Sequence, residues 1–203
     1  MATIGLDSLY YAEITEAQSA GSGSEIGDES YGAPKRLAKA ISAEISVELA
    51  EAILYADDGP AETVKEFSKG TVSLGVDDIG TEAAAVLTGA AVDANGVLVA
   101  SSEDVGKYVA IGFRAKKANG KYRYFWLYKV RFSVPNTSLN TKGESVEFST
   151  PTIEGTVLRR NKANEAGKHP WKAEITDDGT TAVGAVCSSW FTGVYEPDFD
   201  TEG

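Results

Sequence analysis

The stretch that decides the fold runs from Val109 to Phe132 and reads VAIGFRAKKANGKYRYFWLYKVRF. Two segments rich in β-branched and aromatic residues flank Asn119-Gly120, the dipeptide favoured in two-residue hairpin turns. If Ala118 pairs with Lys121, apolar residues face one another at every step along one side of the hairpin. The pairs on that side are Ala115–Tyr124, Phe113–Trp126, Ile111–Tyr128 and Val109–Val130. Because a slip of one residue would break this match, the sequence predicts the register as well as the hairpin.

Further strands are expected on both sides of this hairpin. Strict alternation of apolar residues with Ser and Glu predicts a strand from Ile41 to Leu49. The other expected strands are Ile4–Ile14, a hairpin of Thr63–Phe67 and Thr71–Val76 around Lys69-Gly70, short segments 90–92 and 97–100 around Asn95-Gly96, an extended segment 144–158 broken near Pro151, and Trp171–Thr176.

Helical signals are few. Thr81 can cap a short helix that ends at Gly89, and residues 181–191 form either a short helix or a last strand. Six or more strands with one or two short helices and long loops predict an α+β, mainly β class, as a sandwich or barrel. We expect a single domain over residues 1–203, with a flexible arm at 17–34 and a polar loop at 161–170.

The chain is acidic overall but contains one basic segment. Its 203 residues include 19 Lys and Arg against 30 Asp and Glu, a formal charge of −11. Between residues 105 and 143 there are nine basic residues and no acidic ones. Such a segment can attract an acidic surface, including that of a second copy, while the whole chain repels polyanions.

Little in the sequence points to catalysis. His169 is the single histidine and Cys187 the single cysteine, so one chain supplies no catalytic triad and no two-histidine metal site. No glycine-rich phosphate loop or calcium loop matches. No apolar run is long enough to cross a membrane, and the first residues lack the features of a secretory signal. We therefore expect no catalytic, cofactor-binding or metal-binding residues.

The aromatic and basic residues of 121–132 admit several interpretations. On a regular strand the aromatic side chains share one face, and the cations share the other, around Phe125 and Leu127. Single-stranded nucleic-acid binding is disfavoured, because it needs stacking and basic groups on the same side. Cations that frame apolar side chains suit an interface with an acidic partner; the alternative is a solvated face whose apolar residues lie under a helix. The candidate inter-subunit residues are Arg114, Lys116, Arg123, Phe125, Lys129 and Arg131.

Several short segments, taken in order, resemble the major tail proteins of long-tailed phages of Gram-positive bacteria, which are the subunits of the tail tube. The segments span roughly residues 41–158; the chain before and after them matches only loosely. They are LYADD (54–58), GTVSLGVDD (70–78), VAIGF (109–113), NGKYRYFWLYK (119–129), TKG (141–143) and EFSTPTIEG (147–155).

The resemblance implies a β-sandwich subunit that closes into hexameric rings, which stack into a tube through which DNA passes without specific binding. It implies no enzymatic activity, no cofactor and no membrane association. The protein would be assembled in the cytoplasm of the host bacterium and would reside in the tail of the virion. Its partners would be further copies of itself and the tape-measure, tail terminator and baseplate proteins.

The resemblance also assigns roles to two parts of the chain. Family lumens tend to be acidic, so Glu44 and Glu48 on the acidic face of 41–49 are expected to line the lumen. The arm expected to order on stacking contains Gly21, Ser24, Glu25 and Tyr31. A carbohydrate-binding β-sandwich accessory module is the alternative function, and it should expose aromatic side chains in a cleft.

Overall fold

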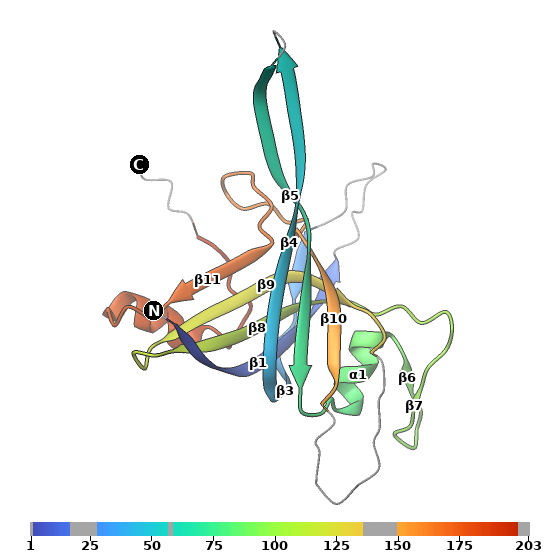
Figure 1. Ribbon diagram of the computed structural model, residues 1–203. Helices are drawn as coiled ribbons and strands as arrows, with labels where there is room; N and C mark the ends of the chain where they lie inside the picture. Colours follow the sequence, from blue (N-terminus) through green and yellow to red (C-terminus); the bar gives the residue numbers. More distant parts are fainter. Residues whose placement is uncertain (1, 17–27, 57–58, 136–149, 199–203) are drawn as a thin grey trace, which may run out of the picture.

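The computed structural model describes residues 2–16, 28–56, 59–135 and 150–198, and it is mainly β with two short helices (Figure 1). The mainly β class expected from the sequence is therefore confirmed. No helix among these residues is long and apolar enough to cross a bilayer. The elements are β1 Thr3–Glu16, β2 Glu29–Tyr31, β3 Lys35–Ala38, β4 Ala40–Ala56, β5 Gly59–Val76, α1 Thr81–Thr88, β6 Ala91–Val92, β7 Leu98–Val99, β8 Tyr108–Lys117, β9 Tyr122–Phe132, β10 Thr152–Leu158, β11 Lys172–Thr176 and α2 Thr181–Ser189.

The main sheet closes on itself. Its strands follow the order β2-β1-β8-β9-β10-β5-β4, and all neighbouring pairs are antiparallel. β3 pairs with β1, and only Lys39 separates β3 from β4, so the last strand of this order is linked through β3 back to β1. Asp77 holds this junction, because its carboxylate accepts the N–H of Lys39 at 2.8 Å. The result is a barrel-like sheet, with β11 added beside β9.

Two apolar cores lie on the two sides of this sheet. The first fills the barrel with residues from β1, β3, β5, β8, β9 and β10, and α1 packs against it through Ala83, Val86 and Leu87. The second lies between the outer side of β8 and β9 and helix α2. Its centre is Trp126, whose indole N–H donates to the carbonyl of Trp190 at 3.0 Å. Strand β9 is therefore buried on both faces.

The β8–β9 hairpin is present, but its register differs from the one expected. Lys117 donates to the carbonyl of Lys121 at 2.8 Å, so the loop has three residues rather than two. Phe113 pairs with Phe125 and Gly112 with Trp126. A bulge between Val109 and Ile111 then restores the expected Val109–Val130 pair.

Three other local expectations need correction. The turn expected at Lys69-Gly70 is absent, because β5 continues through these residues and pairs with β4 along its length. Gly80 rather than Thr81 is the N-cap of α1, which has no side-chain cap, although Gly89 ends the helix in the left-handed conformation as expected. Residues 29–31, placed in the flexible arm, form strand β2 against β1.

Candidate assembly surface

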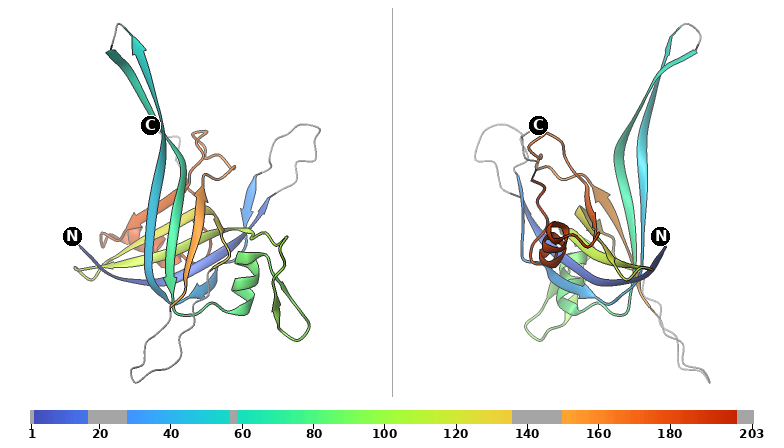
Figure 2. Two further views of the ribbon diagram at one scale, coloured as in Figure 1. Left: turned by 45° about the vertical axis from the view of Figure 1, so that its right-hand side comes forward. Right: turned by 90° about the vertical axis from the view of Figure 1, so that its left-hand side faces the viewer.

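A long β-hairpin projects from the barrel (Figure 2). Strands β4 and β5 pair from Ala40–Val76 at the base to Ala56–Gly59 near the tip. β10 pairs with β5 only from Gly70 to Gly75, so among the described residues the distal part of the hairpin has no third strand. A free two-stranded hairpin is marginally stable in water, and both of its edges can accept another strand.

The two faces of this hairpin differ in chemistry. The face that continues the barrel interior carries Val47, Leu49 and Phe67, and the ring of Phe67 stacks on Trp171 with centroids 4.7 Å apart. Val47 and Leu49 are exposed in this subunit. An apolar stripe therefore extends beyond the barrel rim into solvent.

The opposite face is polar and acidic. Glu44 and Glu48 lie on it and are exposed, as the alternation of the sequence predicted. Their cross-strand neighbours on β5 are Ser73 and Lys69, and Lys69 forms a 3.4 Å ion pair with Glu48. The face continues across β10 through the exposed residues Thr152, Glu154 and Thr156.

The single face of cations expected on the β8–β9 hairpin does not form. Arg114 and Lys116 pair with Tyr124 and Tyr122, not with Phe125 and Arg123 as expected, so they lie on the side of the aromatic residues. Arg114 sits 4.3 Å over the ring of Tyr122 and pairs with Asp7.

Lys129 is buried and Phe125 is partly buried, so neither forms an open surface. Phe125 packs against the barrel core and stacks on Phe113, with ring centroids 5.0 Å apart. Lys129 is buried, and its Nζ lies 2.6 Å from the carboxylate of Glu29. Both expectations failed because the true register and the bulge change which side each residue faces.

The remaining candidate cations keep partial exposure. Arg123 forms an ion pair with Glu174 on β11. Arg131 lies over the ring of Tyr108 and donates its Nε–H to the carbonyl of Gly106 at 3.0 Å. Lys116 is exposed at the end of β8. The structure thus disperses the six candidates instead of bringing them together.

A buried ionic network ties β2 to the rest of the subunit. The carboxylate of Glu29 also accepts the N–H of Asn161 at 2.7 Å. Nearby, the buried Arg160 pairs with Glu196 at 2.8 Å and lies over Tyr128. Neither Glu29 nor Arg160 could be identified from the sequence, because their partners are distant along the chain.

The stacking arm is only partly described. Tyr31 belongs to β2 and is half-buried among aromatic residues, where burial raises the pKa of its hydroxyl. Gly21, Ser24 and Glu25 lie outside the described residues. Tyr31 therefore belongs to the packed subunit and not to a free arm.

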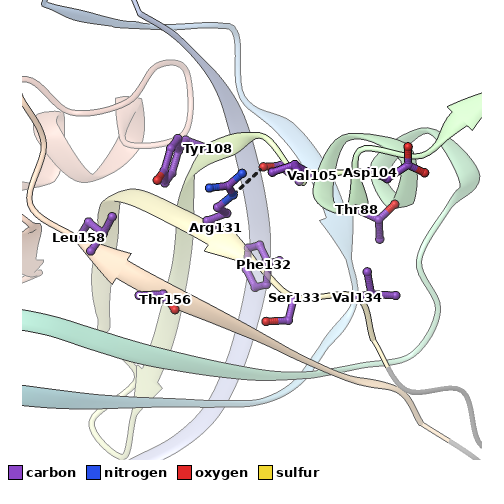
Figure 3. A pocket seen from close by; sticks show the side chains of 11 residues that line it. Thr88, Asp104, Val105, Tyr108, Arg131, Phe132, Ser133, Val134, Thr156 and Leu158 are labelled. Atoms are coloured by element: carbon purple, nitrogen blue, oxygen red, sulfur yellow. Dashed lines mark hydrogen bonds between the residues drawn. The ribbon is translucent and has the colours of Figure 1, made fainter. Parts of the chain in front are cut away.

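A hollow of about 450 Å³ lies beside β9 and β10 and is lined in part by Val105, Tyr108 and Arg131 (Figure 3). Its two charged side chains are engaged locally: Asp104 accepts the N–H of Ser101 at 2.7 Å, and Arg131 donates to the carbonyl of Gly106. No His, Cys, Lys or Glu side chain is among the residues that line it. We find no chemistry in this hollow that would define a ligand.

Three further features were considered for a chemical role: Cys187, clusters of metal ligands, and the aromatic residues of β9. Cys187 lies in α2 and is buried, and burial raises the pKa of its thiol. Within the described ranges no three His, Cys, Asp or Glu side chains cluster as metal ligands. The aromatic residues Tyr124, Trp126 and Tyr128 are buried, so they form neither a sugar-binding cleft nor a base-stacking platform.

Comparison with known proteins adds no assignment. No protein-family model matches the chain, and no curated protein is significantly similar to it.

Proposed function

We propose that this protein is a structural subunit that self-assembles into stacked rings, forming the tail tube of a long-tailed phage through which DNA is delivered. The observation that carries the proposal is the projecting β4–β5 hairpin. Its length exceeds what the subunit core uses, since in residues 63–76 of β5, where burial is described, the buried residues lie between Gly70 and Val76. The hexameric size of the ring and the virion location come from the resemblance of the sequence segments.

The hairpin supports assembly through its unpaired edges and its apolar stripe. Backbone N–H and C=O groups along a free edge recruit a further strand, and a second copy is a partner always present at equal concentration. Val47 and Leu49 would leave water in such a contact, and burial of apolar area is the main driving force of association. Pairing with a neighbouring subunit also protects an edge that would otherwise invite aggregation.

The polar face supports a role in lining a passage for DNA. It offers short Ser and Thr side chains with carboxylates from Glu44, Glu48 and Glu154. Carboxylates repel the phosphate backbone, and the face offers no aromatic platform on which bases could stack. DNA could therefore slide past such a surface without being retained.

Negative-stain electron microscopy and light scattering over a concentration series test the proposal. Wild-type protein should form hollow tubes or stacked rings. A variant in which residues 50–66 are replaced by Asn-Gly keeps the Leu49–Phe67 pair but removes the distal hairpin. It should remain folded and monomeric.

Exchanging Glu51 and Lys65 provides the matched control, because it preserves both the hairpin length and their cross-strand ion pair. This control should assemble like the wild type. Tubes formed equally well by the shortened variant would refute the role of the hairpin. A wild-type protein that stays monomeric at every concentration would refute self-assembly.

A further inference from the structure

The segment between α1 and β8, residues 89–106, carries an exposed aliphatic surface. It contains the short β6–β7 hairpin and the stretch that leads into β8. Five aliphatic side chains in it are 38–58% exposed: Val92, Val97, Leu98, Val99 and Val105. Exposed aliphatic residues that gather in one place mark interaction surfaces more often than scattered ones do.

The same segment is acidic. Residues 89–106 contain Asp93, Glu103 and Asp104 and no Lys or Arg. None of the three forms an ion pair with another described residue; their oxygens accept turn N–H groups, the side-chain amide of Asn95 and the Ser102 hydroxyl. We call residues 89–106 the acidic end.

The other end of β8 has the complementary character. Ile4 is 64% exposed there, and the pairs Thr3–Lys117 and Gly5–Lys116 place it beside two lysines. Lys116 and Lys117 form no ion pair among the described residues, whereas the neighbouring Arg114 and Arg123 already pair with Asp7 and Glu174. We call Ile4, Lys116 and Lys117 the basic end.

The two ends lie far apart on one subunit. The ten residues of β8 separate them, which at roughly 3.3 Å per residue is about 30 Å. Figures 1 and 2 show the β8–β9 turn and the β6–β7 hairpin on opposite sides of the barrel. A surface and its complement at opposite ends of one chain produce a heterologous contact, which repeats into a ring or a filament.

We propose that the basic end of one copy docks on the acidic end of the next copy. Ile4 enters the aliphatic surface of the β6–β7 hairpin, and Lys116 and Lys117 meet the carboxylates of Glu103 and Asp104. This inference rests on the proposed function, because it names the second copy as the partner. It adds a subunit contact distinct from the β4–β5 hairpin.

Charge reversal with complementation tests the contact. The first variant is Lys116→Glu/Lys117→Glu, and the second is Glu103→Lys/Asp104→Lys. Each alone places like charges in every contact, so self-association measured by sedimentation velocity should weaken by about tenfold or more. A 1:1 mixture should restore assembly, because each variant then finds an oppositely charged partner at both ends. Circular dichroism checks that each variant is folded.

The control Arg159→Glu/Lys168→Glu makes the same change of net charge as the first variant, but outside both ends, and should assemble normally. If wild-type protein assembles and both variants assemble equally well, this contact is wrong while the proposed function stands. The same conclusion follows if the folded variants fail alone and the mixture fails as well. A wild-type protein that never associates overturns both.

Discussion

The substitution Gly112→Ala tests the packing on which the outer layer depends. Gly112 pairs with Trp126 across the β8–β9 hairpin. A Cβ at residue 112 would lie 2.8 Å from three atoms of the indole ring of Trp126. In the register expected from the sequence, Phe113 faces Trp126 instead, and residue 112 would point to the other side of the sheet.

The loss of stability caused by Gly112→Ala follows from the tight packing around the indole ring of Trp126. Carbon atoms in contact normally lie about 3.5–4.0 Å apart, so the indole would have to move by about 1 Å. Trp126 is fully buried, and its N–H bond to Trp190 opposes that movement. Overpacking of this kind costs about 1–3 kcal/mol, and the reduced entropy of the unfolded chain returns about 0.4–1 kcal/mol. We expect a net loss of about 1–2 kcal/mol in the free energy of unfolding.

Urea denaturation of both proteins measures the loss. Gly184→Ala is the matched control, because Gly184 lies in α2 with no atom within 4 Å of the added Cβ, and it should stabilise the protein by about 0.5–1 kcal/mol. Combining Gly112→Ala with Trp126→Phe should cost less than the sum of the two single changes. A Gly112→Ala protein as stable as the wild type would refute the observed register.

Charge changes elsewhere test single interactions. Phage carrying Glu44→Lys and Glu48→Lys should assemble tubes but deliver DNA slowly or not at all, and unchanged infectivity would refute the lumen assignment. Glu29→Gln removes the charge opposite the buried Lys129 and should lower the free energy of unfolding by about 3 kcal/mol; a loss under about 1 kcal/mol would contradict a stabilising pair. Partial burial raises the pKa of Asp7, but hydrogen bonds from Arg114 and Ser8 leave that pKa below its ordinary 3.8. The stability that ionised Asp7 contributes is therefore present above pH 3.8 and is lost as the pH falls through the lower pKa of the folded protein. Asp7→Asn should therefore reduce the loss of stability on acidification below pH 3.8, measured by urea titration, and an unchanged acid dependence would contradict this.

The hairpin could be predicted from the sequence, but its register could not. Asn119-Gly120 marks a reversal in either register, since Gly120 adopts a φ of 82° in the three-residue loop as well. A two-residue type I′ turn would also need a positive φ at Asn119, which the structure does not have. Because β9 is buried on both faces, the slipped pair Phe113–Phe125 is as apolar as the expected pair Phe113–Trp126.

The candidate surface was predictable only where local alternation decided it. The exposure of Glu44 and Glu48 followed from the period of two in β4, which a barrel with one solvated face preserves. The burial of Lys129 did not follow, because a bulge reorients it and its partner Glu29 lies 100 residues earlier in the chain. Bulges and distant partners leave no periodic signal in the sequence.

The absence of the turn expected at Lys69-Gly70 is relevant to function. Locally this dipeptide resembles a turn, yet it pairs with Glu48 and Val47, and a Cβ at Gly70 would lie 3.0 Å from the carbonyl oxygen of Ser46. Gly70 therefore permits close approach of two strands rather than a reversal, and β5 runs over 18 residues where two short strands were expected. The barrel core does not require the distal half of this hairpin, and the subunit gives it no third strand among the described residues. We therefore propose that a neighbouring copy supplies part of the free energy that keeps the distal hairpin extended.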